Sequence, residues 1–460
     1  MTGAAPVAVR LVLPAGPAID PFALAGPDGI LVNDGSRILV GLGPGLPIEL
    51  TGGVADGPSV AAVGGVLRSV SCDDRAADRR SGRPGSGVVA FGALPFDRHR
   101  PAAVEVPGLT YCREPDGAEW VTVLAADRAG LPDPDDPAAA GRVRARLIDL
   151  AGSRPQTATG HRHVTVEPRS GDEEFLTSVA AAVAAIHRRE LEKVVLARTV
   201  DVRWAGDLDL PDLLRRWSAL EPGSTVFSLP GADGRFVGAS PELLVERSGD
   251  AFRCVPLAGT TSRHPVDAGG MPTALLDSGK DAEEHRLVVE YIRQALAPHA
   301  AALTVPDHPV LIHLHNLTHL GTTIDGSLRV GPGGRVPTAL ELSALLHPTP
   351  AVAGVPLQPA LDLIEELESA PRGSYAGPVG WVDASGDGRW VVGIRALTVG
   401  DAAARLTAGV GIVSGSIPEV ELAETRLKLN AVLDALRPPA GAGATAAGPD
   451  AYALTRGAPE

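Results

Sequence analysis

Residues 172–200 place the tightest limit on how this 460-residue chain can fold. The first part, DEEFLTSVAAAVAAIHRREL (172–191), has apolar side chains at helical spacing and acidic residues in its first turn, so it predicts a helix. The run that follows, KVVLAR (193–198), is apolar and partly β-branched, which is typical of a strand buried on both faces. The sheet that contains this strand must therefore be covered on both sides.

Lys193 is the first residue of this run, and its role has two interpretations. At a strand edge, its ammonium group could reach solvent while its alkyl chain packs on apolar neighbours. Buried beside a positive charge, a lysine releases its proton more readily and can act as a base. The residues alone leave both interpretations open.

The other elements follow from periodicity and turn residues. Up to residue 125 the pattern predicts short strands and turns, then a loop at 129–141. Further helices are expected at 142–152, 279–299, 337–347, 357–369 and 418–436. Further strands are expected at 235–247, at 251–261, in a hairpin at 377–399, and before a glycine-rich loop within 404–416. Residues 153–163 predict a linker, and residues 438–460 predict a disordered tail.

The charge of the chain limits its partners. With 41 basic and 55 acidic residues, its net charge of −14 offers no general surface to nucleic acid or to an anionic membrane. An anionic substrate would need local positive charge or a metal ion. We find no signal peptide, no 18-residue uncharged apolar run and no CxxC pattern among the three cysteines. These features predict a cytoplasmic protein.

Carboxylates recur at helical spacing in two of the expected helices. Glu421, Glu424 and Lys428 share one face of the last helix, and Asp281 and Glu284 lie three residues apart in another. Two such helices could share a hard cation such as Mg²⁺, which prefers oxygen ligands. The alternative is a set of solvated acids in first turns, where the helix dipole favours them.

Single polar residues in apolar surroundings are further candidates. Glu242, in GASPELL, could have a raised pKa and act as a general acid, or could simply be a turn or helix-start glutamate. His319 and Arg395 lie in strand-like apolar runs. A lone histidine there is usually a satisfied core residue, whereas a buried arginine needs a partner, which a carboxylate ligand could supply.

The glycines of GVGIVSGS (409–416) suggest a phosphate loop, but the spacing matches neither the dinucleotide-binding fingerprint nor a P-loop. A tight turn is the alternative. In either case the backbone N–H groups near Gly409 and Gly411 could approach an anion closely.

Ten ordered motifs together resemble the chorismate-utilising enzymes. They run from residue 193 to 429: KVVLAR, GASPELL, PLAGT, KDAEEH, THLGTTIDG, HPTPAVAG, GSYAGPVGW, GIRALTV, AGVGIVSGS and ELAETRLKL. The resemblance implies an α/β fold in which two antiparallel-rich β-sheets pack face to face with helices outside. It implies three regions: a β-rich part of the same fold at 1–160, a chorismate-binding region at 161–437 and the tail at 438–460.

Two of the motifs indicate which branch of this family the chain resembles. Lys193 matches the lysine of members that use water as nucleophile, and HPTPAVAG resembles isochorismate synthases. No amidotransferase region is present in the sequence, so no amidotransferase subunit is expected. The resemblance therefore implies an Mg²⁺-dependent isochorismate synthase, an isomerase, and favours a monomer. The product could serve menaquinone or siderophore biosynthesis.

The resemblance also implies a role for each candidate residue. Lys193 would deprotonate the attacking water, and Glu242 would protonate the leaving hydroxyl. The metal ligands, direct or through water, would be Glu284, Glu424, Glu421 and Asp281. The substrate-binding residues would be Thr260, His319, Ala351, Tyr375, Arg395, Gly409, Gly411 and Lys428.

Some positions depart from the family pattern. Thr261 stands where many relatives carry arginine, and Ala370 and Pro371 stand where an aromatic and an acidic residue are commoner. These departures leave the shape of the pocket and its regulation open. The alternatives are a salicylate synthase, which also eliminates pyruvate, a non-catalytic chorismate-binding paralogue, and a metal-free nucleotide-binding protein.

Overall fold

The computed structural model describes residues 6–73, 83–153, 164–204, 208–262, 274–331, 334–400 and 403–436. The predicted linker, beyond its first residue, and the predicted tail lie outside these residues.

The largest sheet has 13 strands and carries the segment that opened the sequence analysis. In spatial order its strands are β10 (Val164–Pro168), β11 (Lys193–Trp204), β25 (Ala403–Ile412), β24 (Ala396–Val399), β13 (Gly234–Ser240), β12 (Thr225–Gly231), β2 (Ile30–Asn33), β3 (Ile38–Leu42), β8 (Leu109–Arg113), β9 (Glu119–Ala125), β1 (Val7–Val12) and β5 (Ser71–Asp73). The short strand β21 (Gly354–Val355) also pairs with β11.

A second sheet has nine strands, and a third has three. The second runs β17 (Ala300–Thr304), β20 (Ile324–Leu328), β15 (Ala251–Val255), β14 (Leu243–Ser248), β23 (Gly388–Val392), β22 (Pro378–Asp383), β6 (Val89–Ala93), β7 (Ala102–Val106) and β4 (Leu46–Leu50). The third consists of β16 (Leu257–Ser262), β19 (Leu317–Gly321) and β18 (Val310–His313). Both large sheets draw strands from either side of residue 160.

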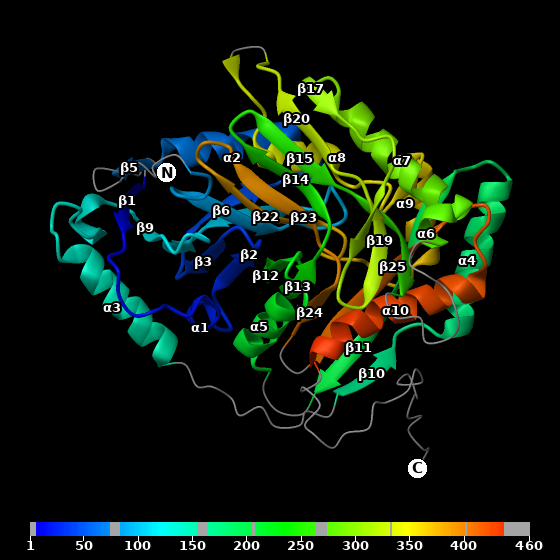
Figure 1. Ribbon diagram of the computed structural model, residues 1–460, viewed down its shortest axis with the longest axis horizontal. Helices are drawn as coiled ribbons and strands as arrows, with labels where there is room; N and C mark the ends of the chain where they lie inside the picture. The colour runs from blue at the N-terminus through cyan, green and yellow to red at the C-terminus, as the bar shows by residue number, and fades with distance from the viewer. Residues whose placement is uncertain are drawn as a thin grey trace.

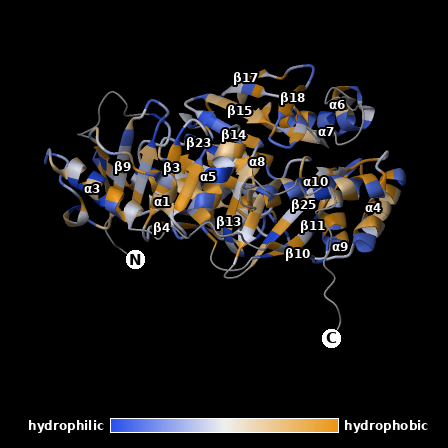
Figure 2. Ribbon diagram, turned by 60° about the horizontal axis from the view of Figure 1, so that its bottom comes forward, coloured by the Kyte–Doolittle hydropathy of each residue, from blue (hydrophilic) through white to orange (hydrophobic). Residues whose placement is uncertain are grey.

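The two large sheets pack face to face, as expected. One buried cluster joins Val32, Leu39 and Phe227 of the first sheet to Phe91 and Trp381 of the second. Figure 1 shows β2 and β3 beside β6 and β22, and Figure 2 shows hydrophobic residues gathered on the strands in the interior. The third sheet is an addition to the expected architecture.

The helices surround these sheets. They are α1 (Pro21–Ala25), α2 (Gly57–Ser69), α3 (Ala139–Gly152), α4 (Asp172–His187), α5 (Leu210–Leu220), α6 (Ala274–Asp277), α7 (Gly279–Leu296), α8 (Ala339–Leu346), α9 (Leu357–Leu367) and α10 (Pro418–Leu436). Every helix predicted from periodicity is present, and two one-turn 3₁₀ helices, Gly53–Ala55 and Arg128–Gly130, complete the set within the described ranges. None of the helices seen is long and apolar enough to span a bilayer.

Two details differ from the sequence prediction. The N-terminal part is not only strands and turns, because α1 and α2 interrupt it, and α2 buries Val60, Val63 and Leu67 at helical spacing. Only the first part of the segment predicted as a hairpin, 377–399, forms one. Strands β22 and β23 pair in the second sheet, and β24 then joins the first sheet. The chain changes sheets at Arg395, which has a φ of +53°.

Strand β11 is covered on both faces, as its composition predicted. Val194 and Leu196 belong to the same buried cluster as Phe175 and Val179 of α4. Val195 points the other way, into a cavity, and successive side chains of a strand alternate between its faces. Lys193 therefore lies on the cavity side of β11, between the sheet and helix α7.

Candidate active site

A cavity of about 60 Å³ lies where β11, β25, the third sheet, α7 and α10 meet. Ten of the predicted site residues line it: Glu242, Thr260, Glu284, His319, Ala351, Tyr375, Arg395, Gly409, Gly411 and Lys428. Four do not: Lys193, Asp281, Glu421 and Glu424.

Arg395 supplies a half-buried positive charge to this cavity. Its position between two sheets turns the side chain inward, and Nη2 lies 3.2 Å from Nε2 of His319. No carboxylate of the described residues forms an ion pair with it, and burial lowers the pKa of its guanidinium. A half-buried guanidinium without an acidic partner is suited to an anionic ligand.

His319 orients Arg395 and is itself satisfied. Its Nδ1 lies 2.9 Å from the carbonyl oxygen of Gly259, so we assign the proton to Nδ1 and leave Nε2 to accept from Arg395. Burial, and then Arg395, lower the pKa of His319 to about 3, so the ring is neutral. The satisfied-histidine interpretation is thus supported, although the residue also lines the cavity.

Glu242 has the environment of a general acid. The residue is 4% exposed, at the point where the chain passes from β13 to β14. Burial raises the pKa of its carboxyl to about 8, although Lys193 and the N–H group of Leu257 act in the opposite direction. At pH 7 the protonated form exceeds the ionised form by about ten to one, because one pKa unit is a factor of ten. The alternative of an ordinary turn glutamate does not fit this burial.

Lys193 is fully buried, which rules out the solvent-reaching interpretation. Its Nζ lies 3.1 Å from Oε1 of Glu284, but no contact of Nζ with a described residue has the geometry of a hydrogen bond. Burial acts to raise the pKa of Glu284, yet Lys193 and Lys428 together hold it below its ordinary value. The ammonium therefore has a charge partner and hydrogen-bonding capacity to spare.

Helices α7 and α10 bring further carboxylates to the same place, each beside a lysine. Lys280 on α7 lies 2.5 Å from Glu421 on α10, and Lys428 lies 2.6 Å from Glu424 one turn before it. Glu421 is 1% exposed, and burial raises its pKa despite Lys280. These acids are not the solvated first-turn residues of the alternative interpretation.

The donor set fits a hard cation in chemistry, although the described side chains do not form a preassembled metal site. Among them, no three His, Cys, Asp or Glu side chains converge closely enough to hold an ion. Oε2 of Glu421 is buried and accepts no hydrogen bond of ordinary geometry from the described part of the chain. Burial also raises the pKa of Asp281, which feels the charges of Glu284 and Glu424. Carboxylate oxygens on two adjacent helices are the ligand type that Mg²⁺ prefers.

The glycine-rich segment is neither a phosphate loop nor, at its first two glycines, a turn. Gly409 and Gly411 lie in strand β25, paired with Ala197 and Val195 of β11. A Cβ atom at Gly411 would lie 1.9 Å from Oε1 of Glu284. At Gly409 the backbone oxygen accepts from Lys428 Nζ at 2.9 Å. These glycines are required because side chains approach the strand closely, not because the chain turns.

Several cavity residues were not foreseen: Val195, Pro241, Leu257, Gly259, Val352, Arg372 and Ile394. Val195 follows Lys193 by two residues, so strand alternation could have found it. Arg372 has no such signal, because its neighbours in the sequence are small or polar and its burial depends on distant segments.

Comparisons with known proteins identify the family of this chain. Residues 71–437 match the protein family described as chorismate binding enzyme. A Mycobacterium tuberculosis (strain H37Rv) protein named MenF is 40% identical over 394 residues, 83% of this chain and 94% of that protein. The isochorismate synthase EntC of Escherichia coli K12 is 34% identical over 349 residues, 75% of this chain and 80% of EntC.

Solved structures share the fold. The menaquinone-specific isochorismate synthase MenF of Escherichia coli superposes with a TM-score of 0.73 over 95% of both chains, at 23% identity. Anthranilate synthase component I of Streptococcus pneumoniae superposes with a TM-score of 0.69 at 19% identity, over 92% of this chain and 94% of its own. At these identities the likeness concerns the fold alone.

Proposed function

Because this chain belongs to the chorismate-binding enzyme family, we propose that it is an isochorismate synthase, an isomerase that interconverts chorismate and isochorismate. The observation that carries the proposal is one cavity holding both a protonated Glu242 and a half-buried Arg395 that lacks an acidic ion-pair partner in the described ranges. The first can give a proton to a leaving hydroxyl, and the second can bind a carboxylate.

The reaction exchanges one hydroxyl for another on the same ring. Water adds at C2, the ring double bonds shift, and the C4 hydroxyl leaves as water after taking a proton from Glu242. Lys193, in its neutral amine form, accepts the proton of the attacking water, and solvent then restores both groups. Its Nζ lies 3.1 Å from Oε1 of Glu284 and has hydrogen-bonding capacity left for this water. Lys193 and Glu242 each supply one proton transfer, the task of a general base and a general acid.

Arg395, held by His319, binds one substrate carboxylate in this proposal, and Tyr375 assists it. Burial raises the pKa of Tyr375 to about 12, so its hydroxyl stays a neutral donor. Thr260, Ala351, Lys428 and the backbone at Gly409 and Gly411 complete the pocket wall. Because Arg395 has no acidic ion-pair partner among the described residues, an uncharged ligand would leave it unpaired, which favours a carboxylate ligand.

We further propose that Mg²⁺ is the cofactor, held by Glu284 and Glu424, with Glu421 and Asp281 acting through water. When bound, the ion would neutralise and orient the second substrate carboxylate. The role of the chain is to hold these acids close together. The adjacent lysines, Lys280 among them, offset the repulsion between the carboxylates.

The remaining expectations are proposals of the same kind. Residues 1–160 and 161–437 form one catalytic unit that works as a monomer, without an amidotransferase subunit, in the cytoplasm. The buried cysteines Cys112 and Cys254 form no disulfide among the described residues, which supports a reducing compartment. The relatives are named for menaquinone in one case and for the siderophore vibriobactin in another, so both pathways stay open for the product.

The test is incubation of the purified protein with chorismate and Mg²⁺, followed by chromatography of the products. We expect a mixture of chorismate and isochorismate that is reached from either side, because exchanging hydroxyls on one ring is nearly balanced in energy. Salicylate and pyruvate as main products would favour the salicylate synthase alternative. Unchanged chorismate would contradict the proposal and leave the non-catalytic paralogue.

A further inference from the structure

Among the described residues, one edge of strand β11 has no neighbouring strand where β11 passes the cavity. The short strand β21 pairs with Lys193 and Val194, and the N–H of Val195 donates to the carbonyl oxygen of Ala353 at 2.7 Å. Strand β10 takes up pairing only from Val200. Backbone groups between these two partners need hydrogen bonds from elsewhere, because a buried unpaired group is costly.

The side chains of Arg372 and Glu368 fill this gap. Arg372 Nη2 donates to the carbonyl oxygen of Val195 at 2.8 Å, and the N–H of Ala197 donates to Glu368 Oε1 at 2.8 Å. The two side chains also bond each other: Nε donates to Oε2 at 2.9 Å and to Oε1 at 3.2 Å, and Nη2 donates to Oε1 at 2.5 Å. Together they bond β11 at two successive edge groups, as a neighbouring strand would.

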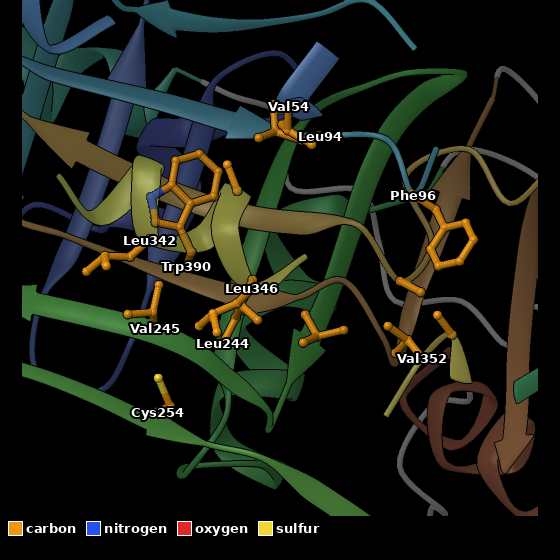
Figure 3. Close-up of a cluster of buried hydrophobic side chains, with 14 of the residues drawn as sticks. Val54, Leu94, Phe96, Leu244, Val245, Cys254, Leu342, Leu346, Val352 and Trp390 are labelled. Carbon is orange, nitrogen blue, oxygen red and sulfur yellow. The ribbon is translucent and has the colours of Figure 1, made fainter. Parts of the chain in front are cut away.

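The same arginine ties down a second wall of the cavity. Its Nη1 donates to the carbonyl oxygen of Val352 at 2.6 Å, next to Ala351, and its guanidinium lies 4.2 Å from the ring centre of Phe96. Figure 3 shows Phe96 and Val352 at the same end of a buried cluster. Because three of its nitrogens are engaged with the protein, Arg372 has little left to offer a substrate.

We propose that Arg372 and Glu368 are a positioning pair, which sets the distance between strand β11, with its Lys193, and the wall at Ala351–Val352. This inference rests on the proposed function, because it assigns the pair to the same reaction. A buried ion pair is by itself weak evidence for stability, since an apolar pair of similar size often serves as well. What apolar side chains cannot replace is the set of three backbone hydrogen bonds that converge on the cavity.

The chain offers a matched control in Arg144 and Glu119. They form a buried ion pair at 2.6 Å, and Arg144 also donates to backbone carbonyls, at Gly16 and Pro17. None of these four residues lines the cavity. Substitutions in the control pair therefore report the cost of disturbing a buried, backbone-bonded ion pair away from the reaction.

The decisive variant is the apolar pair Glu368→Leu/Arg372→Met, with Arg372→Lys and Glu368→Gln as single changes. We expect the apolar pair to lower the melting temperature about as much as the control pair Glu119→Leu/Arg144→Met does, because both lose backbone hydrogen bonds, while kcat falls about 10²-fold, the scale of a displacement of about 1 Å. KM for chorismate should change about threefold or less, because Arg395 is untouched. Arg372→Lys should lose kcat similarly, since one ammonium cannot reproduce a fork of donors. The control Glu119→Leu/Arg144→Met should keep kcat within about twofold of wild type.

A second readout needs no substrate. In the apolar pair, hydrogen exchange of the peptide covering residues 193–199 should be at least about tenfold faster, because the N–H of Ala197 loses its acceptor. If wild type does not act on chorismate, the proposed function fails and this readout alone decides the positioning role. Unchanged protection at Ala197 would overturn the positioning role. The positioning role would also be overturned if the apolar pair matched the wild type in both melting temperature and kcat. It would be overturned as well if kcat fell only as far as the loss of melting temperature explains, judged from the control pair.

Discussion

Replacing Glu242 by glutamine should stabilise the protein, by an amount that grows with pH. Burial raises the pKa of this carboxyl from 4.5 to about 8. Between these values the folded protein holds a proton that the unfolded chain has lost. The stability of the wild type therefore falls as the pH rises from about 4.5 to about 8. Glutamine does not ionise, so the Glu242→Gln variant lacks this loss.

The size of the effect follows from the shift. One pKa unit corresponds to about 1.36 kcal/mol, so the shift of about 3.5 units costs the wild type about 5 kcal/mol once the pH is well above 8. The same relation gives a cost of about 1 kcal/mol at pH 5 and about 4 kcal/mol at pH 8. The advantage of the glutamine variant should thus grow by about 3 kcal/mol over this range.

The assay is guanidinium unfolding of both proteins at pH 5, 6, 7 and 8. Glu366→Gln, which removes an exposed carboxylate from α9, controls for the loss of one negative charge. Turnover of Glu242→Gln should fall by about 10²- to 10⁴-fold, the range for a lost general acid. A stability difference that stays constant within about 1 kcal/mol from pH 5 to pH 8 would refute the argument that burial keeps this carboxyl protonated.

Three further predictions concern the same cavity. Lys193→Ala should lower kcat by about 10²-fold or more, and should also lower the melting temperature, because Glu284 is left buried without its partner; unchanged kcat would remove Lys193 from the chemistry. Glu284→Gln should raise the Mg²⁺ concentration needed for half-maximal activity more than Glu421→Gln does, and equal titration curves would contradict the direct role of Glu284. Gly411→Ala should abolish most activity because its Cβ atom meets Glu284, whereas Gly415→Ala, with nothing within 4 Å, should be near normal in the same assay.

Much of the fold could be read from local patterns. Helices such as α4, α7 and α10 have apolar periodicity over 16 to 19 residues, and each lies where the pattern placed it. Strand β11 was recognisable because its first residues are apolar on both faces. Shorter elements were harder to predict from the sequence. Helix α2 has four glycine or proline residues among its 13 residues, and its buried face carries only a few apolar side chains.

The sequence by itself also determined which residue types the site contains, because its ordered motifs include the acids, lysines and glycines that line or surround the cavity. It did not determine their states. The pKa of Glu242 near 8 and the burial of Lys193 depend on segments more than 40 residues away along the chain: Glu242 feels the charge of Lys193, and Lys193 lies against Glu284. Local patterns report periodicity, whereas desolvation and charge pairing depend on which distant segments meet.

Only the tertiary structure showed that Gly409 and Gly411 are strand residues, and that Arg372 and Glu368 complete the edge of β11. A glycine in a turn and a glycine beneath a neighbouring side chain look alike in a sequence. An arginine that bonds Val195, 177 positions away, likewise leaves no periodic signal. These features follow from how sheets and loops pack, because a hydrogen bond between distant segments forms only once the fold has brought both partners together.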